Sequence, residues 1–205
     1  MTTDKSLVVC ARPILFSGAM VRAIIEGRKT QTRRVMKPQF PKDTVYPFAD
    51  QGKSCIDHPT RGFGAMPART SCGADFDNFV KCPCGRVGDT LWVRETWAPH
   101  GERGAIYQAT NIAYAVARWH PSIHMPRWAS RLTLEITDIR VQRLQEISSE
   151  DAVAEGFYQA VRESADGIGQ DVIGWYRGVW NSINAKRAPW SNNPWVWVLT
   201  FRRIP

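Results

Sequence analysis

Residues 27–34 read Gly-Arg-Lys-Thr-Gln-Thr-Arg-Arg and gather four cations, two hydroxyls and one amide within eight positions. Such a stretch could bind an anion, or it could bring a lysine amine close to a threonine hydroxyl. Lys29 and Thr32 are three residues apart, so a regular strand would point them to opposite faces, whereas Thr30 and Thr32 would share one face. Lys29 therefore meets Thr32 only if it lies in the turn before the strand or curls over the start of the strand.

A basic edge strand is the simpler interpretation of this stretch. Charged side chains on an edge strand keep sheets from aggregating, and runs of charge are usually solvated faces. Spacing alone favours this interpretation. In it, Arg28, Arg33 and Arg34 serve phosphate attraction or plain solvation.

A short helix and a strand are expected to position these residues. Ser17 is suited to be the N-cap of a helix over residues 17–26, and Gly27 can end it in a left-handed conformation. The threonines that follow are β-branched and favour extended backbone, so a strand should open at Lys29 or Thr30. The apolar residues of the helix recur on one face: Met20, Val21, Ile24 and Ile25.

Four further strands are expected after the insertion. Residues 90–97 alternate, with Leu91 and Val93 on one face, and residues 106–110 form a short strand. Residues 131–141 alternate clearly until the parity changes near residues 137–138, which predicts a bulge. Residues 194–202 are apolar on both faces, which predicts a central closing strand.

Two helices are expected between these last strands. Ser148 with Asp151 predicts a capping box for a helix that continues to Glu155 and ends at Gly156. A second helix is expected over residues 171–183. Its apolar face comprises Val172, Tyr176, Val179, Trp180 and Ile183.

Residues 38–87 form an irregular insertion, interrupted by prolines and glycines. A loop of this length inside a compact domain is unusual unless it is functional or held by something, and a structural zinc ion could hold it. The Cys-x-Cys spacing is tighter than the usual Cys-x-x-Cys, so free thiols in a loop are an equal alternative. The candidate ligands are Cys72, Cys82, Cys84 and either Cys55 or His58, with Cys55 taken as the fourth.

Residues 92–97 read Trp-Val-Arg-Glu-Thr-Trp. Arg94 and Glu95 could form a buried ion pair, or this segment could line a pocket, with Arg94 and Trp97 contacting the substrate. The loop over residues 118–130 is rich in aromatic, histidine and arginine side chains of the kind that stack on bases.

The 205 residues, 43% of them hydrophobic, predict a single domain over residues 1–205 with the insertion at about 38–87. A net charge of +8 favours an anionic partner, RNA or DNA before a membrane surface, over a basic protein with no nucleic-acid role. No apolar run approaches the roughly 20 residues that span a bilayer. No secretory signal of the usual form is present, so we expect a cytoplasmic monomer without membrane partners.

Three segments resemble the ASCH family. They are residues 27–32 (Gly-Arg-Lys-Thr-Gln-Thr), residues 88–93 (Gly-Asp leading into Leu-Trp-Val) and residues 147–155 (Ile-Ser-Ser-Glu-Asp-Ala-Val-Ala-Glu). The segments Arg-Pro-Ile-Leu-Phe-Ser-Gly and Asn-Pro-Trp-Val-Trp-Val are similar in sequence to segments of ASCH proteins of phages and prophages. The resemblance covers most of the chain outside residues 38–87 and 111–128. It implies an α+β fold, a PUA-like β-barrel with short flanking helices.

The resemblance also implies an activity and a site. The ASCH enzyme that hydrolyses N(4)-acetylcytidine uses a lysine, a threonine and a glutamate, which fall on Lys29, Thr32 and Glu155. Phe16, Ser17 and Arg34 are then expected near the pocket, with a modified nucleoside or RNA as partner and no catalytic cofactor. Other ASCH proteins are similar to RNA-binding modules or ribonucleases, so both remain alternatives.

Two mechanisms follow from that assignment. In the preferred one, a neutral Lys29 activates Thr32 as the nucleophile while Glu155 orients the leaving amine. In the other, Glu155 activates a water, Lys29 holds the oxyanion as a cation, and Thr32 positions the substrate.

Overall fold

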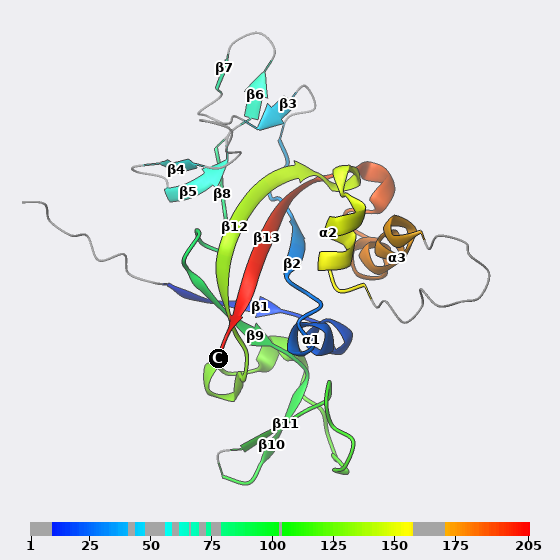
Figure 1. Ribbon diagram of the computed structural model, residues 1–205. Helices are drawn as coiled ribbons and strands as arrows, with labels where there is room; N and C mark the ends of the chain where they lie inside the picture. The colour runs from blue at the N-terminus through cyan, green and yellow to red at the C-terminus, as the bar shows by residue number, and fades with distance from the viewer. Residues whose placement is uncertain are drawn as a thin grey trace, which may run out of the picture.

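The computed structural model describes residues 10–40, 44–47, 56–58, 62–65, 67–69, 73–74, 79–102, 104–157 and 171–205. The fold is mixed α+β, with a mainly sheet core and few helices, as the sequence predicts at this level (Figure 1). The main sheet has the strand order β1-β9-β12-β13-β2. Its strands are β1 (Ala11–Leu15), β9 (Thr90–Arg94), β12 (Thr133–Arg143), β13 (Trp195–Ile204) and β2 (Gln31–Val35).

The expected closed barrel is not found among the strands that the structure describes. The sheet is open, with β1 and β2 at its two edges, and α1 (Gly18–Ile25) connects them. No ladder joins these two strands in the described part of the chain. A single side chain spans the gap instead, because Arg34 of β2 donates to the carbonyl oxygen of Leu15 in β1 (2.6 Å).

Strand β13 is central, as its apolar sequence predicts, because it lies between β12 and β2. Alternate residues of this strand enter two different apolar clusters. Trp195, Trp197 and Leu199 pack on the face that contains Leu91 and Leu134. Val196 and Val198 pack on the other face, where Tyr176 and Trp180 of α3 (Val172–Asn184) and Ala152 of α2 (Ser149–Ala154) contribute.

The predicted helix ends at Gly27 and Gly156 and the predicted bulge in β12 are confirmed. Gly27 and Gly156 follow α1 and α2 with φ angles of 75° and 106°, the left-handed region that glycine tolerates. The β12–β13 register shifts between Ile136 and Asp138, where the side-chain parity changes. Ser17 is the N-cap of α1 but makes no side-chain cap bond, whereas Ser148 accepts the backbone N–H of Asp151 at α2 (3.1 Å).

The strand expected over residues 90–97 ends early, at Arg94. Glu95 breaks it, because its backbone N–H points to the Met125 sulfur (3.2 Å) and its carboxylate pairs with Arg131. Trp97 then begins a separate hairpin of β10 (Trp97–His100) and β11 (Gly104–Tyr107). Strand β11 corresponds to the short strand expected over residues 106–110, but it begins two residues earlier. The loop over residues 118–130 contains the 3-10 turns Ser122–His124 and Arg127–Ala129.

The described parts of the 38–87 insertion form short strands in two small sheets, which lie beyond one end of the main sheet in Figure 1. They are β3 (Thr44–Pro47), β6 (Pro67–Arg69) and β7 (Gly73–Ala74), and β4 (Ile56–His58), β5 (Gly62–Ala65) and β8 (Val80–Lys81). No helix in the described part of the chain is both long enough and apolar enough to cross a membrane.

Candidate functional site

Lys29 and Glu155 are the centre of the site. Lys29 lies between Gly27 and the first residue of β2, and it pairs with Glu155 as an isolated antiparallel bridge. Its backbone N–H donates to the carbonyl of Ala23 in α1 (3.0 Å). These contacts place Lys29 in the turn before the strand, one of the two positions that the sequence left open, and direct its side chain toward the end of α2.

The Lys29 ammonium is fully buried and has three acceptors. Its Nζ lies 2.6 Å from Glu155 Oε2, 2.8 Å from the Gln31 carbonyl oxygen and 2.9 Å from the Glu155 carbonyl oxygen. Three acceptors match the three donors of a protonated lysine. Burial lowers the pKa of Lys29, and the Glu155 charge and hydrogen bond oppose that effect. The resting geometry is therefore that of a buried ion pair.

A second cation meets the same carboxylate. Arg33, whose side chain is wholly buried, lies 3.2 Å from Glu155 Oε1 and 2.6 Å from Asp151 Oδ2. The Tyr176 hydroxyl donates to Glu155 Oε1 (3.4 Å), and burial, with Glu155 adding to it, raises the pKa of Tyr176 well above its usual value. Arg33 is thus neither solvated nor free for phosphate, which corrects that expectation. Arg33 follows Gln31 by two residues in the strand, so both side chains point to the α2 side of β2, where they are in contact (2.6 Å). This spacing is the signal in the sequence that could have located Arg33.

Asp151 ties this network to β12. It accepts hydrogen bonds from Arg140 (2.8 and 2.7 Å), Gln31 (3.1 Å) and Arg33 (2.6 Å). The predicted capping box is therefore only half formed, because the Asp151 carboxylate turns to these donors. Burial raises the pKa of Asp151, but the Arg140 hydrogen bond and the charges of Arg33 and Arg140 outweigh it, so the net shift is downward.

Asp151→Asn is expected to flatten the acid side of the stability profile. A carboxyl whose folded pKa is lowered stabilises the fold above its unfolded pKa, about 3.9, and that stabilisation is lost as the pH falls through the folded value. The wild type should lose more free energy of unfolding than Asp151→Asn between about pH 5 and the acid limit. Urea unfolding at stepped pH measures this. Asp138→Asn is the matched control, since this exposed carboxylate lies 3.6 Å from the same Arg140. Equal acid slopes for Asp151→Asn and wild type would contradict the assignment.

Two cavities are lined in part by Glu155. One, of about 60 Å³, lies between β2 and α3 and is also lined by Thr32, Arg34 and Tyr176. The other, of about 260 Å³, lies between α1 and α3 and is lined by Glu155 and mainly by apolar side chains. Its lining residues are Ser17, Ala19, Met20, Ala23, Gly156, Trp175, Val179, Ser182 and Ile183. Lys29 is not among the described residues that line either cavity, so Glu155 is the charged member of the pair that faces them.

Thr32 lies in the β2–α3 cavity with Glu155. It is buried, and its backbone pairs with Leu199 of β13. Within the described part of the chain, Thr32 makes no side-chain hydrogen bond to Lys29 or Glu155. The structure therefore brings Lys29 and Glu155 into contact and places Thr32 at the same cavity as Glu155.

The residues expected beside the pocket are found close to this pair. Ser17 lines the α1–α3 cavity and Arg34 lines the β2–α3 cavity. Phe16 is buried, with the Lys29 Nζ 5.7 Å and the Arg34 Cζ 5.1 Å from its ring centre. Its aromatic face offsets part of the cost of burying two cations.

Arg94 and Trp97 lie in another part of the fold. Arg94 stacks over Trp92 (5.4 Å) and donates to the Ile123 carbonyl, and Trp97 packs edge to face with Trp128. Neither residue lines the cavities at Glu155. The buried ion pair of this segment joins Glu95 to Arg131 (2.9 Å at both oxygens) rather than to Arg94.

Two of the four proposed zinc ligands fall within the structure. Cys82 is buried and Cys84 is half-buried, and a hydrogen bond from the Cys82 thiol lowers the pKa of Cys84. Cys55 and Cys72 lie outside the described residues. Among the residues that are described, no three histidine, cysteine or acidic side chains are grouped to hold a metal ion.

The site as a whole joins four elements. Lys29 comes from the turn before β2 and Thr32 from β2 itself, Asp151 and the C-cap Glu155 come from α2, Tyr176 comes from α3, and the cavity walls also use α1. Such a carboxylate, held by two cations and facing a small cavity and a larger apolar one, can exchange a proton with a bound group. Comparison with protein-family models, with curated proteins and with solved structures finds no match to this chain.

Proposed function

We propose that this protein is an amidohydrolase that removes the acetyl group from N(4)-acetylcytidine or a related acylated nucleoside, on a PUA-like fold of the ASCH type. One observation carries the proposal. The Glu155 carboxylate is almost fully buried and is held by Lys29 and Arg33, and Glu155 is among the residues that line both cavities. A structural ion pair has no need of a cavity on either side, whereas a catalytic carboxylate does.

The reaction uses Thr32 as the nucleophile. Glu155 replaces Lys29 as the base expected from the sequence, because the Lys29 amine has three acceptors and Lys29 is not among the described residues that line either cavity. Glu155 takes the Thr32 hydroxyl proton as that oxygen bonds to the acetyl carbon, and it returns the proton to N4 as the carbon–nitrogen bond breaks. Water then hydrolyses the acetyl-threonine ester with Glu155 as base, which releases acetate. Arg34 lines the same cavity and supplies positive charge for the oxyanion. Lys29, behind Glu155, orients the carboxylate and offsets the cost of burying its charge.

The α1–α3 cavity suits a pyrimidine. Its volume of about 260 Å³ is close to the lower end of ligand pockets, roughly 300 Å³. Met20 and Trp175 offer apolar and aromatic surface for a flat ring, and Ser17 and Ser182 offer hydroxyls. This composition favours a neutral base over a charged group.

Purified protein incubated with N(4)-acetylcytidine should release cytidine and acetate, because Glu155 lines a cavity that suits a pyrimidine. Liquid chromatography measures cytidine directly. Lys29→Met is the inactive control, since it removes the cation that orients Glu155. Absence of cytidine together with fragmentation of added RNA would replace this proposal with a ribonuclease. RNA affinity without either product would favour a binding module.

A further inference from the structure

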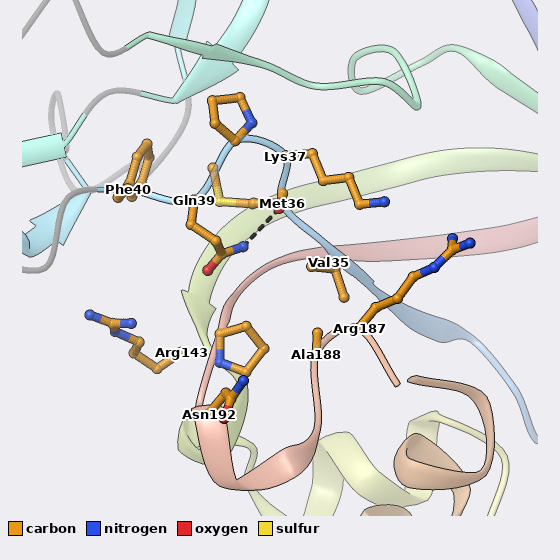
Figure 2. Close-up of a pocket in the computed structure, with 11 residues that line it drawn as sticks. Val35, Met36, Lys37, Gln39, Phe40, Arg143, Arg187, Ala188 and Asn192 are labelled. Atoms are coloured by element: carbon orange, nitrogen blue, oxygen red, sulfur yellow. Dashed lines mark hydrogen bonds between the residues drawn. The ribbon is translucent and has the colours of Figure 1, made fainter. Parts of the chain in front are cut away.

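Another pocket, besides the two cavities that Glu155 lines, lies at the far end of β2 from Lys29. It has a volume of about 410 Å³ and follows the chain from Val35 through Phe40, with residues of the β12 end and of the segment between α3 and β13 opposite (Figure 2). Among the residues that the structure describes, the lining contains three cations, Lys37, Arg143 and Arg187, and no acidic side chain.

The cations are not neutralised within the described part of the chain. No described carboxylate lies within ion-pair distance of Lys37, Arg143 or Arg187. Glu146, a nearby acid, accepts the backbone N–H of Arg143 (3.0 Å). Lys37 and Arg187 are exposed, so their charge is directed to solvent and to any anion that enters.

The floor of the pocket is fixed by hydrogen bonds to β13. The Gln39 amide donates to the carbonyls of Met36 (2.7 Å) and Trp195 (3.0 Å) and accepts the Trp195 backbone N–H (2.7 Å). Arg143 lies over the Trp195 ring, with its Cζ 4.2 Å from the ring centre, and donates to the Asn193 carbonyl (3.2 Å). Arg143 is therefore held in place before a ligand arrives, which reduces the entropy lost on binding.

The arrangement of charge suits a chain of anions. In Figure 2 the Lys37 and Arg187 side chains extend to the same side of the pocket, and Arg143 lies on the opposite side, with apolar side chains between. A single small anion would contact only one of these sides. A phosphodiester strand presents successive charges, with sugars and bases that can lie on the apolar floor.

We propose that this basic pocket binds the phosphodiester backbone of single-stranded nucleic acid. Val35 lines both this pocket and the β2–α3 cavity, so a strand bound here would lead toward Glu155 along β2, over about 13 Å. That the same strand presents the acylated base to Glu155 rests on the proposed function. Binding at the pocket does not depend on it.

Lys37→Gln/Arg187→Gln tests the pocket by fluorescence anisotropy with an unmodified, labelled 12-nucleotide RNA. The double variant should bind roughly tenfold more weakly at 0.1 M salt, and the slope of log K against log salt should become shallower by about 1.4, since each contact to a single strand contributes about 0.7. The control is Arg177→Gln/Arg203→Gln, which removes the same charge from exposed positions outside the pocket.

Each outcome decides the proposal. Weaker binding for the pocket variant alone supports it, and equal weakening in both double variants would overturn it in favour of general charge attraction. A DNA 12-mer of the same sequence is the second arm. Similar loss on RNA and DNA supports recognition of the backbone, and loss on RNA alone would overturn it in favour of contacts to the 2′-hydroxyl. Because the probe carries no acetyl group, failure of the hydrolysis assay leaves this result intact.

Discussion

Glu155→Gln is expected to lower the free energy of unfolding by about 3–5 kcal/mol, the usual cost of breaking a buried ion pair by removing one partner. The substitution keeps the shape of the side chain but leaves the Lys29 ammonium without its carboxylate at 2.6 Å and Arg33 without the one at 3.2 Å. Amide hydrolysis should be lost as well, since the amide has no proton affinity to replace that of the carboxylate. Urea unfolding measures the first effect and cytidine release the second.

Glu150→Gln is the matched control for this prediction. Glu150 lies in α2, the helix that Glu155 caps, but it is exposed, so its substitution should leave the urea midpoint close to that of the wild type. The double variant Lys29→Met/Glu155→Gln should recover part of the loss, because no unpaired ammonium remains buried. A Glu155→Gln protein that unfolds at the wild-type urea concentration would show that the pair contributes little to stability.

Local sequence patterns were sufficient to place the elements around this pair. The glycine after each of α1 and α2 ends its helix where expected, and the change of parity in β12 locates the bulge. These features depend on backbone preferences of a few neighbouring residues, which the sequence contains. The strand start was predicted less well: β2 begins at Gln31, later than the Lys29 or Thr30 start that the threonines predict, so Lys29 lies before it.

The partners of the charged residues depended on tertiary packing and were harder to predict. In sequence, Arg33 is one of several cations in a run, and nothing local distinguishes it from the half-buried Arg28 or from a cation on a solvated edge. Its burial results from α2 and α3 covering one face of β2, where Asp151, Glu155 and Tyr176 meet it. The open sheet also depends on a tertiary contact that local sequence does not contain. The edge of β1 accepts a hydrogen bond from the Arg34 side chain and does not pair with the backbone of β2.

Thr32→Val should lower kcat/KM for N(4)-acetylcytidine by at least roughly 10³-fold, because it removes the proposed nucleophile while keeping a β-branched side chain of similar size. Thr32 is buried and pairs with Leu199 in the sheet, so valine also preserves the preference of this position for extended backbone. The loss should fall on kcat, since the α1–α3 cavity that would hold the base does not include Thr32. Steady-state kinetics separate kcat from KM.

Two further variants distinguish a nucleophile from a residue that only shapes the cavity. Thr32→Ser retains the hydroxyl and should keep kcat/KM within about tenfold of wild type, whereas a role in packing alone would make serine at least as damaging as valine. Thr30→Val makes the same chemical change two residues earlier, at an exposed position, and should leave the rate unchanged. Near wild-type turnover by Thr32→Val would instead make water the nucleophile, with Glu155 as its base. Because Glu155 faces both cavities, its carboxylate would then be essential while the threonine hydroxyl would not.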